Sequence, residues 1–209
     1  MKKLNVLTAV LCAASAPLLA QEPAVIELPK PDQEGGKPLM QTLMGRKTGR
    51  AFSEKEISME TLSSLLWAGF GVNRDDGRRT APTARNSQDM TIYLLTPKGA
   101  FMYDAKANTL VTRSETDARE EAVPQAWGKK APLVLYFVQT VNGEPNRQTD
   151  LFGGMHAGSI YQNVSLFNVS AGLIDCVVAT FNNDAARKAL NLPDNQRIIV
   201  GQIIGYPQE

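Results

Sequence analysis

The stretch from Thr149 to Leu173 constrains the fold more than any other part of the sequence. Its apolar residues recur at helical spacing with small glycine and alanine residues between them, which predicts one long buried helix that another helix can approach closely. Before it, Leu133 to Gln139 is a nearly continuous apolar run of strand length. The two segments together predict a central strand with a long helix packed nearby.

Shorter elements on both sides complete an α+β pattern without an internal repeat. Pro38 suits the first position of a helix that Gly45 ends. Ser53 and Glu56 match a capping box, which predicts that a second helical region starts there and ends near Gly71. Further helices are expected over 115–123 and 183–190, and strands over 91–96, 100–103, 109–112, 174–181 and 198–204.

The chain is expected to have three parts. Residues 1–20 have the pattern of a secretory signal peptide, because Lys2 and Lys3 precede an apolar run that ends at the small residue Ala20. That run is shorter than the ~20 residues of a spanning helix, so soluble export to the periplasm is expected, with an uncleaved membrane anchor as the alternative. Residues 21–37 are rich in proline and glycine and predict an extended N-terminal arm, which could wrap a partner. Residues 38–209 form one domain.

Charge and residue types argue against several classes of function. Without residues 1–20, 22 − 2 = 20 basic residues face 21 acidic ones, and this net charge of about −1 does not indicate nucleic-acid binding. Cys176 and His156 are too few for a zinc site, so no metal is expected. The sequence has no nucleophile-elbow serine, GxGxxG fingerprint or P-loop, so neither a hydrolase nor a Rossmann site is indicated. Cys176 is expected to be a small buried residue.

Two segments rich in basic and hydroxyl-bearing residues remain, Arg46–Arg50 and Arg78–Asn86. The first offers guanidinium groups, a hydroxyl and free backbone amides, which are the donors that a phosphate group needs. The second lies in a polar, turn-rich stretch from Asn73 to Gln88, and ordered loops of this length are uncommon unless they have a function. Spacing alone leaves a solvated basic helix end as the alternative.

The order of several short motifs resembles the nitroreductase family, especially its small, thiazole/oxazole-oxidase-like branch. Gly45–Phe52 is similar to the segment Arg-Arg-Ser-x-Arg-x-Phe that opens these domains, Leu65–Asn73 to Leu-Leu-Trp-Ala-x-x-Gly, and Arg79–Gln88 to Arg-x-x-Pro-Ser-Ala-x-Asn-x-Gln. Weaker matches follow in the family's order: Gln125 before Ala131-Pro132, Ala157-Gly158, Gln162-Asn163, Gly172-Leu173 and Gly205-Tyr206-Pro207. Each motif is common alone, but the shared order is specific.

The resemblance implies a nitroreductase-like fold, with a mainly antiparallel central sheet flanked by helices and FMN held at the interface of a homodimer. Arg46 and Thr48, with Lys47 beside them, would bind the FMN phosphate. Arg50 would face the pyrimidine edge of the flavin, where a fixed cation stabilises the negative charge that reduction places near N1 and O2. The remaining implied contacts are Pro82, Thr83, Ala84 and Asn86 from the other subunit, the backbone of Ala179 and Thr180 near N5 and O4, and Gln125 at the ring edge.

The implied activity is an FMN-dependent oxidoreductase that reduces a nitroaromatic, quinone or similar electrophilic small molecule by ping-pong hydride transfer. No side chain is assigned as a catalytic acid or base. NAD(P)H is one candidate reductant, but reduced nicotinamides are normally found inside the cell, so an exported enzyme could use another donor or run as an oxidase. The alternatives are a flavin-dependent oxidase of peptide-derived heterocycles, a flavin-binding protein without turnover, and a structural domain without cofactor.

The sequence departs from the family pattern in two places. The basic residues that often hold the phosphate near the C-terminus of relatives are missing after Tyr206-Pro207, and Arg197 or Arg85 is the expected substitute. His156 stands where relatives often have an acidic residue, and a single histidine in an apolar helix is expected to be structural.

Overall fold

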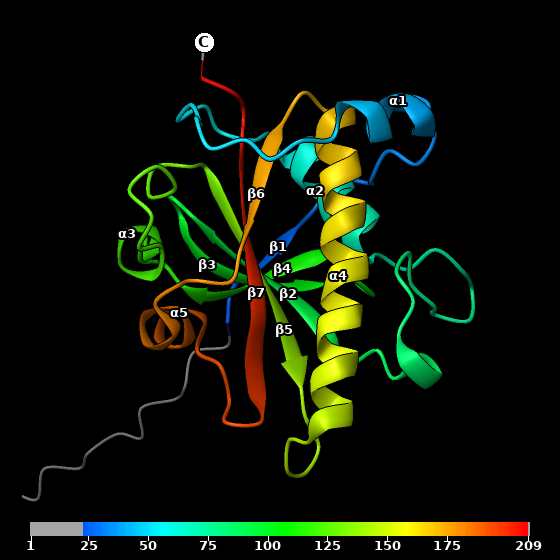
Figure 1. The fold of residues 1–209 in the computed structure, drawn as a ribbon, viewed down its shortest axis with the longest axis vertical. Coiled ribbons are helices and arrows are strands. Elements are labelled where there is room, and N and C mark those ends of the chain that lie inside the picture. Colours follow the sequence, from blue (N-terminus) through cyan, green and yellow to red (C-terminus); the bar gives the residue numbers. More distant parts are fainter. Residues whose placement is uncertain (1–22, 209) are drawn as a thin grey trace, which may run out of the picture.

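The computed structural model describes residues 23–208, in which seven strands form one antiparallel sheet with helices on both faces (Figure 1). In chain order the elements are β1 (Val25–Glu27), α1 (Leu39–Gly45), α2 (Met59–Phe70), the 3-10 helix η1 (Ala84–Asn86), β2 (Met90–Thr96), β3 (Gly99–Asp104), β4 (Thr109–Ser114), α3 (Arg119–Ala122), β5 (Leu133–Thr140), α4 (Arg147–Ser170), β6 (Ile174–Val178), α5 (Asn183–Leu190) and β7 (Gln196–Gly205). The strand order is β1-β4-β3-β2-β5-β7-β6, and every neighbouring pair is antiparallel. This architecture confirms the α+β fold with an antiparallel central sheet.

The strand β5 lies between β2 and β7 and carries buried side chains on both faces of the sheet. Because side chains alternate along a strand, Leu135 and Phe137 pack in the core under α2 and α4. Val134 and Tyr136 point the other way, into the core shared with α3 and α5. Figure 1 shows these helix pairs on opposite sides of the sheet. A continuous apolar run at 133–139 is what a strand buried on both sides requires.

The helix α4 is the predicted long helix, and its 24 residues begin after Asn146, whose side chain accepts hydrogen bonds from the N–H groups of Gln148 and Thr149. Another helix does approach α4 closely, but the small residue at this contact belongs to α2 and not to the 149–173 stretch. A Cβ added to Gly69 of α2 would lie 2.9 Å from a methyl carbon of Val164 on α4. The two helices therefore pack at a distance that a larger side chain would prevent.

The second helix begins later than the sequence predicts. Its N-cap is Ser58, whose hydroxyl accepts from the N–H of Thr61 at 3.2 Å, so the capping box at Ser53 and Glu56 is wrong. Tertiary contacts explain the difference, because the Ser53 N–H donates to the carbonyl of Tyr206 at 2.9 Å and keeps this stretch extended. The predicted helix over 115–123 is likewise only Arg119–Ala122, and the strand over 174–181 ends at Val178. The other predicted elements agree to within a few residues.

The segment predicted as an extended arm is partly packed on its own chain. Within it, β1 pairs with β4 at the edge of the sheet, and Leu28 is buried. The Asp32 N–H also donates to the hydroxyl of Ser64 on α2 at 2.9 Å. The predicted signal peptide over 1–20 lies outside the described residues. Between residues 23 and 208, no helix is both long and apolar enough to cross a membrane.

Candidate functional site

The first predicted phosphate-binding segment follows α1 and runs beside β6. Arg46 is the C-cap of α1. The Gly49 N–H then donates to the carbonyl of Asp175 at 2.9 Å, and Thr48 forms an isolated parallel bridge with the same residue. Arg46, Lys47 and Thr48 are exposed. The fold therefore anchors the backbone of this segment while leaving its cationic and hydroxyl groups open to solvent.

The Arg50 side chain contacts Trp127 and Cys176, which come from two other parts of the chain. Its guanidinium carbon is 5.7 Å from the centre of the Trp127 ring, within the range of a cation–π contact. On β6, burial raises the pKa of the Cys176 thiol, and the charge and hydrogen bond of Arg50 oppose that shift. Cys176 is 3% exposed, which confirms that it is a buried residue.

Gln125 joins the same end of the molecule to the residues that follow β6. Its amide nitrogen donates to the carbonyl of Thr180 at 2.6 Å. Its side-chain oxygen is buried and has no hydrogen-bond partner among the described residues. Buried acceptors normally have a donor, so this oxygen fits a donor from a bound molecule. Ala179 and Thr180 are exposed beside it. We call residues 46–50 together with Gln125, Ala179 and Thr180 the basic cluster.

The second predicted segment lies beside α4, to the right of that helix in Figure 1. It contains Pro82, Thr83, Ala84 and Asn86, and we call residues 82–88 the αL loop. Arg85, Asn86 and Gln88 have φ angles of 56°, 55° and 46°, which are left-handed backbone conformations at non-glycine residues. Such conformations cost on the order of 1–3 kcal/mol each and persist where surrounding contacts impose them. The αL loop is thus a strained segment that the rest of the fold holds.

His156 on α4 holds the αL loop by its backbone. The Ala84 N–H donates to Nε2 of His156 at 2.8 Å, and Nδ1 of the same ring lies 2.8 Å from Oδ1 of Asp89. The ring is 4% exposed. The sequence predicts a structural histidine at this position but misses what it holds. The available signal was an aspartate directly after the loop motif and a histidine within an apolar helix.

One chain places the basic cluster and the αL loop at different points along α4. His156, which contacts the αL loop, and Asn168, whose side chain donates to Asp175 beside the basic cluster at 3.0 Å, are both in this helix. Twelve residues of helix separate them by about 18 Å, at 1.5 Å per residue. The points at which the two segments contact α4 are therefore far apart within one chain.

The two arginines expected to substitute in phosphate binding differ in their environment. Arg197 on β7 donates to the side-chain oxygen of Gln139 from Nε at 3.1 Å and from Nη2 at 2.8 Å. It also forms an ion pair with Asp150 at 2.6 Å. Its guanidinium is therefore engaged within its own chain, whereas Arg85 in the αL loop is exposed.

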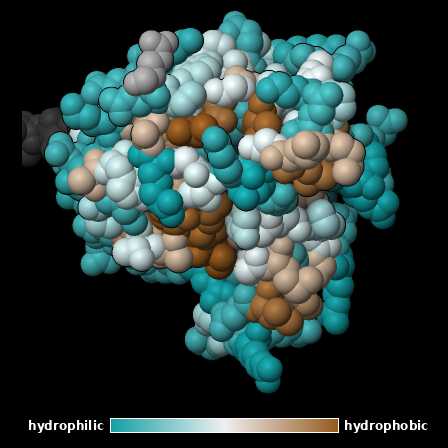
Figure 2. Space-filling model, turned by 45° about the horizontal axis from the view of Figure 1, so that its top comes forward, coloured by the Kyte–Doolittle hydropathy of each residue, from teal (hydrophilic) through white to brown (hydrophobic). Residues whose placement is uncertain are grey.

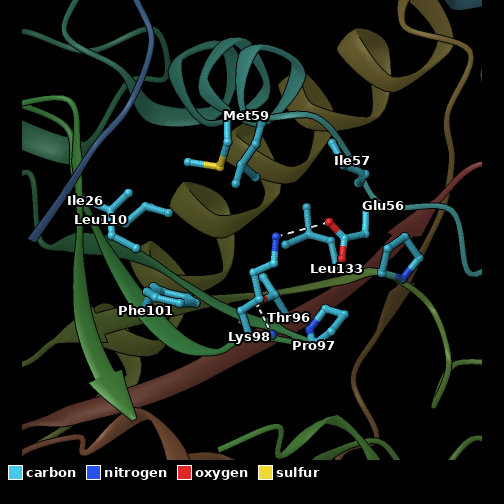
Figure 3. Close-up of a pocket in the computed structure, with 12 residues that line it drawn as sticks. Ile26, Glu56, Ile57, Met59, Thr96, Pro97, Lys98, Phe101, Leu110 and Leu133 are labelled. Atoms are coloured by element: carbon cyan, nitrogen blue, oxygen red, sulfur yellow. Dashed lines mark hydrogen bonds and ion pairs between the residues drawn. The ribbon is translucent and has the colours of Figure 1, made fainter. Parts of the chain in front are cut away.

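A separate apolar pocket lies between β1, the β2–β3 hairpin and the start of α2 (Figure 3). Its walls include Ile26, Met59 and Phe101, and an ion pair of 3.1 Å between Lys98 and Glu56 lies beside them. The predicted flavin-binding residues do not line it, so this pocket is not part of the candidate site. Within residues 23–208, no three histidine, cysteine or acidic side chains gather in a way that could hold a metal ion.

The sequence was compared with family profiles and with the sequences of known proteins. The sequence profile described as the Nitroreductase family matches residues 43–206. A protein of Methanocaldococcus jannaschii, provisionally described as a nitroreductase, is 26% identical in an alignment of 186 residues that covers 81% of this chain and 91% of the relative.

Solved structures give the same picture. A crystal structure from Ralstonia eutropha, also provisionally described as a nitroreductase, is 33% identical, with a TM-score of 0.83 over 91% of this chain and 96% of the other. A chain of the Escherichia coli microcin synthetase complex is 16% identical, with a TM-score of 0.67 over 97% of this chain and 76% of the other, and this likeness is one of fold alone.

Proposed function

This chain belongs to the nitroreductase family and is an oxidoreductase, and we propose that it binds FMN and reduces nitroaromatic, quinone or similar electrophilic small molecules by ping-pong hydride transfer. The basic cluster carries this proposal. It combines exposed Arg46, Lys47 and Thr48 with a buried, unpaired oxygen on Gln125. A phosphorylated molecule with a hydrogen-bonding ring would use both features.

The residues of the basic cluster fit the two ends of FMN. Arg46, Lys47 and Thr48 would bind the phosphate, and Arg50 would lie at the pyrimidine edge, where its contact with Trp127 orients it. Gln125 and the exposed residues Ala179 and Thr180 would contact the ring system. When bound, FMN supplies the redox chemistry, taking a hydride from a reductant such as NAD(P)H and passing two electrons, with protons, to the acceptor.

We propose that the site is completed by a second copy of the chain. About 18 Å of helix separates the contact points of the αL loop and the basic cluster on α4. Residues of the αL loop would then reach the flavin from the neighbouring subunit, as Pro82, Thr83, Ala84 and Asn86 of the partner subunit. A homodimer of this kind has two equivalent sites, each built from both chains.

An unpartnered apolar surface supports the homodimer. The apolar residues of α1 lie in one helix, as the sequence predicts. In a single chain they face solvent, with exposed fractions between 44% and 87% for Leu39, Met40, Leu43 and Met44. Leu151 and Met155 near the start of α4 are similarly exposed. Figure 2 shows apolar patches interrupting the hydrophilic surface on the face that includes α1. Exposed apolar side chains gathered on one helix, as on α1, are typical of a protein–protein interface.

The absorption spectrum of the purified protein tests the proposed cofactor. The protein is expected to be yellow, or to become yellow with added FMN, to bleach with a reductant and to recolour with a nitroaromatic or quinone acceptor. A yellow protein whose flavin cannot be cycled would indicate a flavin-binding protein without turnover. A protein that stays colourless after incubation with FMN would contradict the proposal.

Mixing two inactive variants tests whether the site is shared. Arg50→Ala in one chain and Asn86→Ala in the other are each expected to impair both sites of a homodimer. After the two are mixed, unfolded and refolded together, random pairing puts one intact site in each heterodimer, which restores about a quarter of the wild-type sites. The measurement is acceptor reduction per chain, and the matched control is refolding each variant alone. No gain on mixing would mean that both segments serve the same site from one chain.

We further propose that the enzyme is exported to the periplasm, on the basis of residues 1–20. Fractionation of cells expressing the full chain is expected to recover the shortened protein outside the cytoplasm. Recovery of the full-length chain in the cytoplasm would contradict export and would favour NAD(P)H as the physiological donor.

A further inference from the structure

The buried His156 and the half-buried Asp89 form a pair that the proposed chemistry does not use. We propose that this pair positions the αL loop for FMN, and that it does so only while the His156 ring is neutral. The inference rests on the proposed function, because it takes the αL loop as part of the flavin site. His156 acts through the backbone of Ala84, so it is a positioning residue and not a catalytic one.

Hydrogen-bond geometry sets the protonation state of the ring. A backbone N–H is always a donor, so the contact of 2.8 Å from Ala84 requires an unprotonated Nε2 on His156. In a neutral imidazole the proton is then on Nδ1, which donates to Oδ1 of Asp89 at 2.8 Å. One tautomer of the neutral ring satisfies both partners.

The surroundings of Asp89 favour its carboxylate form. A carboxylate accepts the hydrogen bond from Nδ1 of His156 and so favours this tautomer. Burial alone would raise the pKa of Asp89, but hydrogen bonds from Gln139 and Ser87, the neighbouring His156 and a backbone N–H together lower it. Gln139 donates to Oδ2 at 2.7 Å, and the Ser87 hydroxyl donates to Oδ1 at 2.9 Å. The other charged groups joined to the pair are Arg197, which donates to Gln139, and Asp150, which pairs with Arg197.

Strain in the αL loop makes this anchor necessary. Three non-glycine residues in the loop have left-handed φ angles, and each costs on the order of 1–3 kcal/mol. Internal hydrogen bonds, such as that from the Gln88 N–H to the Thr83 hydroxyl at 3.0 Å, shape the turn. Of the hydrogen bonds described for residues 82–88, the one from Ala84 to His156 is the one that reaches α4. Without it, the loop can relax away from the geometry that a ligand requires.

A second proton on the ring would break this anchor. Protonated His156 carries N–H groups on both nitrogens, so Nε2 would present a donor to the Ala84 N–H. The anchored loop is therefore present at higher pH and is lost as acid adds the second proton. FMN affinity should fall in the same direction.

The test compares His156→Gln with His156→Leu in the full-length dimer. The glutamine oxygen can reach the Ala84 N–H in place of Nε2 but does not titrate, whereas leucine has no acceptor. Ser159→Ala is the matched control, because the Ser159 hydroxyl donates to the carbonyl of Met155 within the same helix. The readouts are FMN affinity across a pH series and, without FMN, hydrogen exchange at the Ala84 amide and the ¹⁵N resonances of the His156 ring.

The wild type is expected to show an unprotonated Nε2, a slowly exchanging Ala84 amide and weaker FMN binding at acid pH. His156→Leu should bind FMN about tenfold more weakly, the loss expected for one hydrogen bond, with fast exchange at Ala84. His156→Gln should stay within about threefold of wild type at neutral pH and lose the acid dependence.

Two results would overturn the inference: FMN binding and Ala84 exchange in His156→Leu that equal the wild type, or a His156→Gln variant that keeps the wild-type acid dependence. A wild type that binds no FMN at any pH would instead overturn the proposed function. Because Ala84 exchange and the ring resonances are measured without FMN, they separate the two failures.

Discussion

Replacing Arg46 with alanine is expected to raise the dissociation constant for FMN about 10- to 150-fold. The reason is that a hydrogen bond to a charged group contributes about 1.5–3 kcal/mol, and Arg46 is expected to donate to the phosphate. Its backbone is fixed at the end of α1, so alanine should leave the segment in place. Fluorescence titration of the apoprotein with FMN measures the change.

A matched control separates a specific contact from a general loss of charge. Lys106→Ala removes one exposed positive charge from the turn between β3 and β4, outside the basic cluster, and should leave FMN affinity within about twofold. Unchanged flavin retention by Arg46→Ala on dilution would remove Arg46 from the site. An equal loss in both variants would indicate attraction by net charge and not a phosphate contact.

Replacing Asp175 with alanine is expected to lower the free energy of unfolding by about 2 to 6 kcal/mol. Asp175 is 6% exposed, and its carboxylate accepts hydrogen bonds from Ser165, Asn168 and Gln202 at 2.9 to 3.0 Å. Alanine would leave the Asn168 amide buried without its acceptor, which costs about 1–3 kcal/mol. It would also remove the hydrogen bonds that Ser165 and Gln202 donate to the carboxylate, and losing bonds to a charged group adds about 1–3 kcal/mol, although Gln202 still donates to Ser165 and Tyr161. The loss is large against a typical total stability of about 5–15 kcal/mol.

Urea denaturation followed by circular dichroism measures this effect. Asp194→Ala removes an exposed carboxylate and should change stability by no more than about 0.5 kcal/mol. A denaturation midpoint for Asp175→Ala equal to that of the control would show that the buried network contributes nothing to stability.

Local patterning predicted most of the secondary structure. The period of apolar residues identified α4, and the continuous apolar run identified β5, because these patterns follow directly from which faces are buried. The start of α2 was misplaced because Ser53 and Ser58 both precede helix-forming residues, and sequence alone does not show that the Ser53 N–H is bonded to Tyr206. A partner more than a hundred residues away decides that boundary.

For the candidate site, too, the sequence predicted some features and the structure alone showed others. The motif order identified the basic cluster and the αL loop, and the structure places the basic cluster along β6, with Thr48 beside Asp175 near its start and Gln125 bonded to Thr180 just after its end. The distance of the basic cluster from the αL loop was not readable from spacing. Nor was the contact between His156 and Ala84, since the two residues are joined by the packing of α4 against a loop 72 positions earlier.

The amino-acid sequence by itself determined the α+β class, the long helix, the central strand and the family, because these depend on periodicity and on short motifs in a set order. Only the tertiary structure decided which polar groups meet: Asp175 with its three buried donors, Gln125 with an unpaired oxygen, and Asp89 with His156 under a strained loop. Hydrogen bonds act over about 3 Å and depend on direction. Their partners are therefore set by the final packing of distant segments and leave little trace in local residue patterns.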